Sequence, residues 1–159
     1  MVCLGNICRS PTAHGVLEKY IKDKGLNTLI EVDSCGTGDW HIGEHPDARA
    51  TAAAAQRGYD ISQQIARQVR TTDFGQFHYI LAMDRTNLKD LKAICPAAQR
   101  SRLSLLLDHG ERNHESVPDP YYSGQHGFEL VLDLVEQACA GLLQRIMADH
   151  SLPSTAAGA

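Results

Sequence analysis

Two cysteines, an arginine and a serine stand close together near the start of the chain, in the stretch CLGNICRS at residues 3–10. A short loop that runs into a helix can turn its backbone N–H groups toward one anion, and the helix dipole favours negative charge there. Arg9 adds a planar fork of donors that matches phosphate oxygens, and the positive surroundings favour the thiolate form of Cys3. The stretch therefore predicts a phosphate site at which Cys3 attacks phosphorus. A buried Cys3 and a surface Arg9 beside an ordinary turn remain the alternative.

A leaving alcohol or phenol must receive a proton, so an acid is expected on another loop near the same site. The stretch VPDPYY at residues 117–122 supplies Asp119, with a proline on each side that stiffens the backbone. Tyr121 and Tyr122 follow, and their rings could line a slot for a flat substrate group. Because an isolated Pro-Asp-Pro sequence is also a common turn, the residues alone make Asp119 a candidate acid only.

Helix and strand patterns alternate along the rest of the chain. Ser10 suits the N-cap of a first helix, Pro11 its first turn and Gly25 its end. The further elements expected are strands at 29–33, 79–83 and 103–107, and helices at 47–57, 86–94 and 128–146. This order favours a single α/β domain over residues 1–150, with a parallel sheet flanked by helices on both faces and ligands at the carboxyl ends of its strands. Residues 151–159 are expected to form a disordered tail.

The composition fits one compact domain. The chain has 159 residues, 43% of them hydrophobic, and a formal net charge of -4, so no basic surface for nucleic acid is expected. No apolar run is long enough to span a membrane, and the N-terminus lacks the pattern of a signal peptide. An odd number of cysteines without a Cys-x-x-Cys pair favours reduced thiols and a cytoplasmic location, and we expect a monomer or a weak dimer. The cysteines are Cys3, Cys8, Cys35, Cys95 and Cys139.

The stretches VCLGNICRSP at residues 2–11 and DPYY at 119–122 resemble the low-molecular-weight protein tyrosine phosphatases. Further stretches similar to that family are 33–34 with Trp40, 66–68 and 83–88. The resemblance therefore covers nearly the whole chain. It implies a four-stranded parallel sheet, phosphotyrosine-containing proteins as substrates, and catalysis without a metal or another cofactor.

The resemblance also implies roles for individual residues. Cys3 is the nucleophile, Arg9 and the loop amides hold the phosphate, and Asp119 is the general acid. The residues that brace the loop are Asn6, Ser34 and Ser10, of which Ser10 also stabilises the thiolate. The residues expected around the phosphate are Leu4, Gly5, Asn6, Ile7, Cys8, Arg9 and Ser10, and those expected around the substrate ring are Ile7, Trp40, Tyr121 and Tyr122.

The second cysteine of the loop suggests a redox role. A loop wrapped around one phosphate brings its ends together, so the Cα atoms of Cys3 and Cys8 are expected within the roughly 4.4 to 6.8 Å that a disulfide requires. Peroxide would convert Cys3 to a sulfenic acid, with which Cys8 would condense before further oxidation. In the alternative, Cys8 only packs its sulfur beneath the loop.

Three features depart from the family pattern. Members usually carry several more residues before the nucleophile, whereas here only Met1 and Val2 precede Cys3, so we expect a truncated first strand. Such a strand reflects either a late start of the chain or a sheet that lacks most of its central strand. Gln64 stands where the family usually has a histidine bonded to the loop asparagine, and His14 stands where it usually has a glutamate. No role is expected for His14.

Four other functions share parts of these patterns. His41, Glu44 and His45 form a His-x-x-Glu-His zinc pattern, but the nearby glycines and proline favour a loop, in which the two histidines would not share a face. Arsenate reductases that resemble this family need further cysteines close together, and Cys95 stands alone. Protein arginine phosphatases typically carry threonine where this chain has Ile7. A phosphotyrosine-binding module without activity also stays open.

Overall fold

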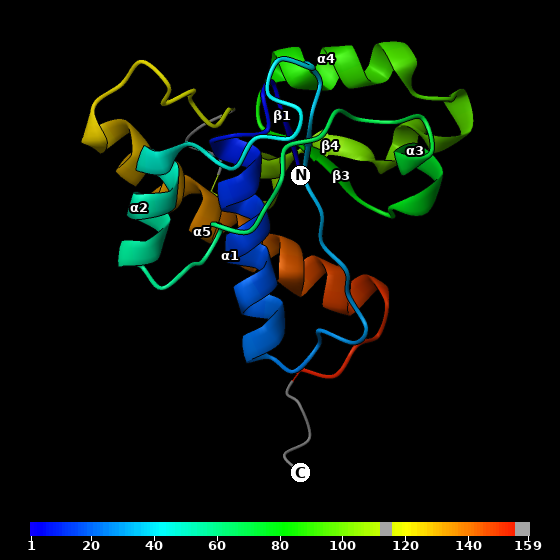
Figure 1. The fold of residues 1–159 in the computed structure, drawn as a ribbon. Coiled ribbons are helices and arrows are strands. Elements are labelled where there is room, and N and C mark those ends of the chain that lie inside the picture. Colours follow the sequence, from blue (N-terminus) through cyan, green and yellow to red (C-terminus); the bar gives the residue numbers. More distant parts are fainter. Residues whose placement is uncertain (112–115, 155–159) are drawn as a thin grey trace.

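A parallel sheet lies between two layers of helices in the computed structural model of the chain, which describes residues 1–111 and 116–154 (Figure 1). The strand order is β2-β1-β3-β4, and neighbouring strands run parallel. The strands are β1 (Val2–Cys3), β2 (Cys35–Gly36), β3 (Ile80–Ala82) and β4 (Leu103–Leu105). The predicted α/β fold with a four-stranded parallel sheet is therefore confirmed.

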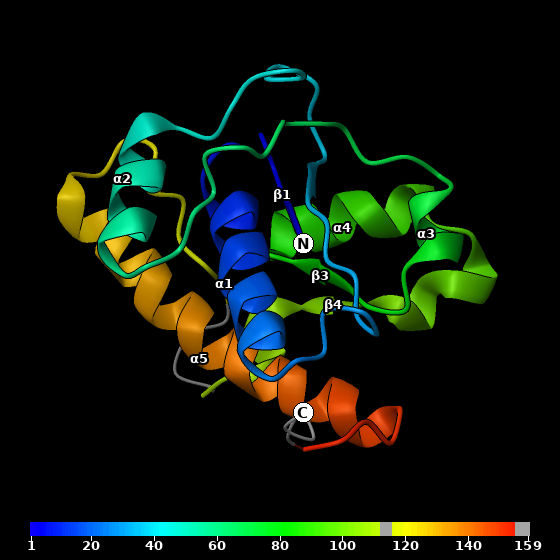
Figure 2. The ribbon, with the colours of Figure 1, turned by 60° about the horizontal axis from the view of Figure 1, so that its bottom comes forward.

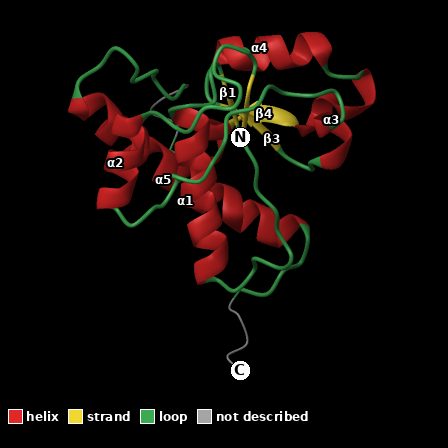
Figure 3. Ribbon diagram, in the orientation of Figure 1, coloured by secondary structure: helices red, strands yellow, loops and turns green. Residues whose placement is uncertain are grey.

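Helices cover both faces of the sheet, as predicted (Figure 3). The helices are α1 (Arg9–Asp23), α2 (Ala48–Gln56), α3 (Asp73–Gln76), α4 (Arg85–Ile94) and α5 (Gln125–Asp149), with short 3-10 helices η1 (Ala97–Arg102) and η2 (Leu106–His109). On one face α1, α2 and α5 pack over Cys3 and Leu81, and Figure 2 shows α1 and α5 side by side. On the other face α3 and α4 pack over Val2 and Ala82. Successive strand residues thus enter opposite core layers, as the pleat of a strand requires.

Helix α1 begins at Arg9 with Cys8 as its N-cap, so the prediction that Ser10 caps this helix is wrong. The reason is that the hydroxyl of Ser10 lies 3.0 Å from the sulfur of Cys3 and is not used as a cap. The other end follows the prediction, because Gly25 has a φ of +69° and this left-handed conformation ends the helix. The first turn of α1 therefore lies directly against the loop that precedes it.

The prediction of a strand at 29–33 is also wrong, because β2 contains only Cys35 and Gly36. An apolar stretch becomes a strand only where a neighbouring strand can exchange hydrogen bonds with it. β2 pairs with β1 in the register Val2 with Cys35, and no described strand pairs with 29–33. Pairing, and not the apolar pattern, therefore sets the position of β2.

Strand β1 is as short as expected but occupies the middle of the sheet. It pairs with β2 on one side, and on the other side Val2 lies opposite Ala82 of β3. The ammonium group of Met1 donates a hydrogen bond to the carbonyl of Asp33 at 3.0 Å. Cys3 is thus the last residue of a central strand and lies at the carboxyl edge of the sheet.

The other predicted elements are present with shifted ends. Asp47 caps α2 by accepting from two backbone N–H groups, and Asp84 caps α4 in a reciprocal capping box with Asn87. Because α3, η1 and η2 are too short to show a period, the sequence did not predict them. Of the tail expected at 151–159, Leu152 packs against the core, and disorder stays a prediction for residues 155–159, which lie outside the described part. None of the described helices is long and apolar enough to cross a membrane.

Candidate active site

The loop from Cys3 to Arg9 joins the end of β1 to the start of α1. Asn6 has a φ of +57°, in the left-handed region, which lets the chain turn back on itself. Its backbone N–H then donates to the sulfur of Cys3 at 3.3 Å. Gly36 of β2 lies so close to this loop that a side-chain carbon there would come within 2.6 Å of the Leu4 carbonyl oxygen. The loop is therefore held tightly around the sulfur of Cys3.

The thiol of Cys3 is buried and has two hydrogen-bond partners. Cys3 is only 3% exposed. Its sulfur lies 3.0 Å from the hydroxyl of Ser10 and accepts from the backbone N–H of Asn6. Both groups can donate to a negatively charged sulfur, and the nearby N-terminus of α1 favours negative charge. The arrangement can therefore supply a thiolate nucleophile.

Buried polar side chains brace the loop. The amide nitrogen of Asn6 donates to Ser10 at 2.8 Å and to Ser34 at 3.0 Å. Its amide oxygen accepts the backbone N–H of Arg67 at 3.0 Å. The structure thus brings together Asn6, Ser10 and Ser34, which the family resemblance indicated as braces. It adds Arg67, which sequence reasoning missed because a backbone N–H leaves no signal in the residue type.

Arg9 is almost fully buried and is held by two partners from distant parts of the chain. Its Nη1 atom donates to the carboxylate of Asp84 at 2.6 Å and to the carbonyl of Val117 at 3.1 Å. Asp84 follows β3, so its side chain reaches the site from the carboxyl end of a neighbouring strand. Sequence reasoning did not assign Asp84 to the site, although a polar residue directly after a buried parallel strand is a usable signal.

The loop after Val117 carries Asp119 to the same edge of the sheet. One carboxylate oxygen of Asp119 lies 3.8 Å from Nη2 of Arg9. The other accepts the backbone N–H of Tyr121, two residues further along the chain, at 3.1 Å and so forms an Asx turn. The carboxylate is 51% exposed, so it can exchange protons with solvent. Asp119 therefore lies beside the loop that carries Cys3 and Arg9, and the three residues come from two segments of the sequence.

The expected substrate walls differ in how they are placed. Ile7 is buried in the core layer on the face of the sheet that α1, α2 and α5 cover, whereas Trp40 is 68% exposed. Tyr121 contacts Tyr122 edge-on with 5.0 Å between ring centroids, and Tyr122 is 96% exposed. The guanidinium of Arg49 lies over the Tyr121 ring at 5.4 Å and donates to its carbonyl, a contact that the sequence did not indicate. Tyr121 is thus held against Arg49, the Trp40 and Tyr122 rings are open to solvent, and the role of these residues around a substrate ring stays a prediction.

The second cysteine of the loop, Cys8, is a free and buried thiol, as are the other four cysteines. Burial raises the pKa of Cys8 to about 12, and the carboxylate of Asp47 and the neighbouring Cys3 act in the same direction. At neutral pH Cys8 is therefore protonated. Of the two loop cysteines, Cys3 is the one that the surrounding donors equip as a nucleophile.

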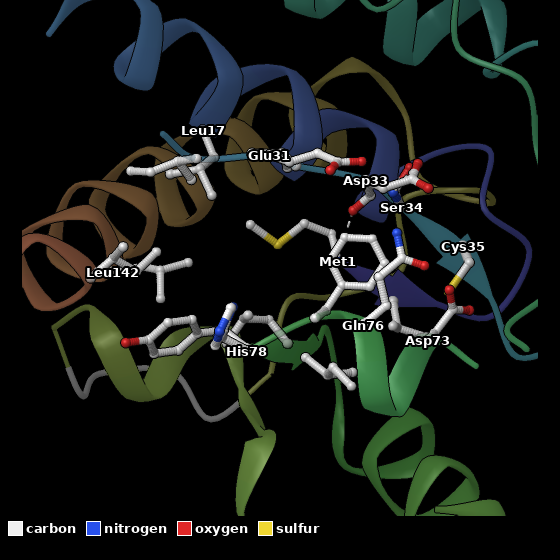
Figure 4. A pocket seen from close by; sticks show the side chains of 18 of the residues that line it. Met1, Leu17, Glu31, Asp33, Ser34, Cys35, Asp73, Gln76, His78 and Leu142 are labelled. Carbon is white, nitrogen blue, oxygen red and sulfur yellow. Dashed lines mark hydrogen bonds between the residues drawn. The ribbon is translucent and has the colours of Figure 1, made fainter. Parts of the chain in front are cut away.

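A cavity of about 540 Å³ lies at the opposite, amino-terminal end of the strands (Figure 4). Met1, Asp33 and His78 are among the residues around it, and neither Cys3 nor Arg9 lines it. Ligands of open α/β sheets bind at the carboxyl ends of the strands. The cavity therefore lies behind the loop, where it touches the bracing residues Ser34 and Arg67 but not Cys3 or Arg9.

The segment with the zinc-like pattern is not helical, as the sequence predicted. His41 lies 2.7 Å from Glu44, while His45 lies 3.1 Å from the carbonyl of Gln64, so the two rings have different partners. Over residues 1–111 and 116–154, no group of three or more histidine, cysteine, aspartate or glutamate side chains is placed to hold a metal ion.

Comparison with known proteins adds independent findings. Residues 1–152 match the family described as "Low molecular weight phosphotyrosine protein phosphatase". A low molecular weight protein-tyrosine-phosphatase of Streptomyces coelicolor is 41% identical over 149 residues, which cover 91% of this chain and 90% of the relative. A protein tyrosine phosphatase of Entamoeba histolytica, solved with Hepes in its active site, has a TM-score of 0.91 at 38% identity and covers 94% of this chain and 96% of its own. A Drosophila arginine phosphatase has a TM-score of 0.85 at 31% identity, with 93% of this chain and 96% of its own covered.

Proposed function

Because the chain belongs to the low molecular weight phosphotyrosine protein phosphatase family, we propose that it hydrolyses phosphotyrosine in proteins through a cysteinyl-phosphate intermediate on Cys3. The observation that carries the proposal is the position of the Cys3 sulfur. It lies inside a loop that ends in the buried guanidinium of Arg9, and it faces the donors Ser10 and Asn6. A thiolate next to a phosphate cradle and a carboxylic acid is the set of groups that a two-step transfer requires.

In the first step the Cys3 thiolate attacks phosphorus, and the bond between phosphorus and the tyrosyl oxygen breaks. Asp119 gives its proton to the departing oxygen, so that a neutral phenol leaves. Arg9 and the backbone N–H groups of the loop stabilise the charge on the three phosphoryl oxygens. The products of this step are tyrosine and a phosphate ester of Cys3.

In the second step water attacks the phosphorus of this ester. Asp119, now ionised, takes the proton of the water, and the bond between phosphorus and sulfur breaks. Inorganic phosphate leaves and the thiolate of Cys3 returns, with the hydroxyl of Ser10 at 3.0 Å to donate to it. The aromatic pair at Tyr121 supports an aryl substrate.

The experiment that tests this proposal is the Cys3→Ser variant assayed with p-nitrophenyl phosphate. We expect it to lose turnover, while inorganic phosphate still binds when measured by calorimetry, because Arg9 and the loop amides are intact. Cys95→Ser, at a cysteine next to α4, is the matched control and should keep full activity. If Cys3→Ser hydrolysed the substrate at a rate near that of the wild type, the nucleophile would be another group.

A second candidate function is protein arginine phosphatase activity. The similarity to the Drosophila arginine phosphatase favours it. Ile7 argues for phosphotyrosine, because an aliphatic side chain offers no acceptor for the N–H groups of a guanidinium. Turnover of phosphotyrosine and phosphoarginine peptides, compared as kcat/KM, separates the two functions. Two further alternatives are tested on the same preparation. Reduction of arsenate would support an arsenate reductase, and a lack of turnover of p-nitrophenyl phosphate would support a module that binds phosphotyrosine without hydrolysis.

The proposal extends to location and assembly. The five buried free thiols support a reducing compartment such as the cytoplasm. The net charge of -4 argues against nucleic acid as a partner. We expect a monomer or a weak dimer, which sedimentation of the purified protein measures directly.

A further inference from the structure

Two side chains that the family pattern leaves unexplained meet at the hydroxyl of Ser34, beneath the loop. Nδ1 of His14, on α1, lies 3.2 Å from Oγ of Ser34, and Oε1 of Gln64 lies 3.4 Å from the same atom. The amide nitrogen of Asn6 is the third partner, at 3.0 Å. Three polar groups therefore share one hydroxyl, which has a single hydrogen to give.

The single hydrogen of the Ser34 hydroxyl limits which of these contacts Ser34 can donate to. An amide NH₂ group can only donate, so Ser34 accepts from Asn6 and gives its own hydrogen to His14 or Gln64. Gln64 directs its NH₂ group to the carbonyl of Pro11 at 3.0 Å, and its oxygen is the more distant of the two acceptors. We assign the hydrogen to Nδ1 of His14, because this atom lies nearer to the hydroxyl than the oxygen of Gln64 does. This assignment places the ring proton of His14 on Nε2.

The surroundings of His14 agree with this tautomer. Nε2 faces the carboxylate of Glu18 at 4.0 Å, one turn further along α1, and a carboxylate attracts an N–H group. Burial lowers the pKa of His14 to about 4, so the ring is neutral at pH 7. The other charged groups that act on the ring are the Met1 ammonium, which favours the neutral form, and Asp33, which opposes it. Nδ1 therefore remains an acceptor through the neutral pH range.

The direction of donation continues from Ser34 to the nucleophile. With its hydrogen directed to His14, the hydroxyl of Ser34 has a fixed orientation, and its oxygen accepts one hydrogen of Asn6 at 3.0 Å. The other Asn6 hydrogen goes to Ser10 at 2.8 Å. Ser10 then donates its own hydrogen, and the sulfur of Cys3 at 3.0 Å is closer than the competing carbonyl of β2 at 3.3 Å.

We propose that His14 is a positioning residue for the nucleophile, which orients Ser34 and Asn6 so that the hydroxyl of Ser10 donates to Cys3. The inference rests on the proposed function, in which Cys3 is the nucleophile. Four hydrogen bonds link His14 to the sulfur of Cys3, through Ser34, Asn6 and Ser10, so its loss should slow the chemical step and leave substrate binding nearly unchanged.

The test compares His14→Asn with His14→Gln. An asparagine oxygen can take the place of Nδ1 and accept from Ser34, whereas a glutamine amide reaches the place of Nε2 and leaves Ser34 without this acceptor. We expect His14→Gln to lower kcat by about 3- to 10-fold with KM unchanged, the range for one lost hydrogen bond, and His14→Asn to stay close to the wild type. Glu18→Gln, which changes only the outer neighbour, is the control and should match the wild type.

The second readout is the pH at which iodoacetamide alkylates Cys3, followed by mass spectrometry. We expect the alkylation profile of His14→Gln to move to higher pH, because Ser10 then donates less reliably to the thiolate, and that of His14→Asn to stay in place. An unchanged profile and kcat in His14→Gln overturn the proposal. Since alkylation needs no turnover, a wild type without phosphatase activity would contradict the proposed function and still leave His14 tested.

A double-mutant cycle tests the route through Ser34. If His14 acts through this hydroxyl, Ser34→Ala produces the same upward shift of the alkylation profile, and adding His14→Gln to Ser34→Ala changes nothing further. Effects of the two substitutions that add up in the double variant would show that His14 acts by another route.

Discussion

The guanidinium of Arg9 and the carboxylate of Asp84 form an ion pair of 2.6 Å that joins the first turn of α1 to the end of β3. Asp84 has a second task, because its other oxygen accepts the backbone N–H of Asn87 and caps α4. One carboxylate therefore fixes both the start of a helix and the orientation of the Arg9 guanidinium. The two tasks can be separated by substitution, because asparagine caps a helix about as well as aspartate but carries no charge.

We expect Asp84→Asn to lower kcat/KM for p-nitrophenyl phosphate by about 10- to 100-fold, because a misplaced guanidinium no longer matches the phosphoryl oxygens. Its free energy of unfolding in urea should fall, because the buried guanidinium of Arg9 loses its counter-ion. Asp84→Ala should lose activity to a similar extent and about 1 kcal/mol more stability than Asp84→Asn, since the cap is also gone. Equal stability of the two variants would contradict the capping role, and an active Asp84→Asn would contradict the role in positioning Arg9.

Asp119→Ala should slow hydrolysis of phenyl phosphate by about 100- to 10,000-fold, the usual contribution of a positioned acid. The loss should be smaller for p-nitrophenyl phosphate, because its leaving group is a weaker base and needs less protonation. The basic limb of the pH profile should also flatten. Steady-state rates of both substrates check this, and equal losses for the two would remove Asp119 from the role of proton donor.

The sequence predicted the site best where the chemistry is local. The loop, Arg9 and the start of α1 are contiguous, and a cysteine, an arginine and a helix start within eight residues limit the geometry strongly. The partners that fix this loop come from elsewhere. Asp84 and Arg67 reach it only because strands far apart in the sequence are neighbours in the sheet. Such contacts depend on strand order, which a single sequence does not contain.

The misplaced second strand has the same origin. The run at 29–33 is apolar and β-prone, yet the strand forms at Cys35 and Gly36, where β1 offers hydrogen-bond partners. The sequence assigns no role to His14, because its contact with Ser34, twenty residues further along the chain, exists only in the folded structure. Residue types thus predicted which groups lie at the candidate site, and tertiary contacts decide which groups hold them in place.

The partly buried ring of His14 should make the fold sensitive to acid. Burial lowers its folded-state pKa to about 4 from an ordinary 6.5, so between these values the unfolded chain binds a proton that the folded protein excludes. The free energy of unfolding should therefore fall as the pH drops from 6.5 to 4, by on the order of 2–3 kcal/mol from this residue. Urea unfolding at several pH values should show a smaller loss for His14→Asn. Parallel pH curves for the two proteins would contradict this assignment.

Ile7→Thr should move the substrate preference toward phosphoarginine, because its hydroxyl can accept a guanidinium N–H group. We expect the ratio of kcat/KM for phosphoarginine to that for phosphotyrosine to rise by about tenfold, the scale of one polar contact in a pocket. Ile7→Val is the matched control, since valine has the shape of threonine without the hydroxyl. A preference that shifts equally in both variants would show that side-chain size, and not polarity, is responsible.

The last prediction concerns oxidation of the two loop cysteines. Peroxide should oxidise the Cys3 thiolate to a sulfenic acid and release hydroxide. The thiol of Cys8 should then condense with it, forming a disulfide and releasing water, before sulfinic acid can form. The inactive protein should regain activity in dithiothreitol.

The fold also explains why Cys8, and not Cys35, is the expected partner. Cys3 and Cys8 belong to the same core layer, whereas Cys35 belongs to the layer on the other face of the sheet. Wild type and Cys35→Ser should therefore recover most of their activity after peroxide and dithiothreitol, and Cys8→Ser should remain largely inactive, with Cys3 found as sulfinic or sulfonic acid by mass spectrometry. Recovery of Cys8→Ser to the level of the wild type would leave Cys8 as a packing residue, and loss of recovery in Cys35→Ser alone would assign the disulfide to the other face.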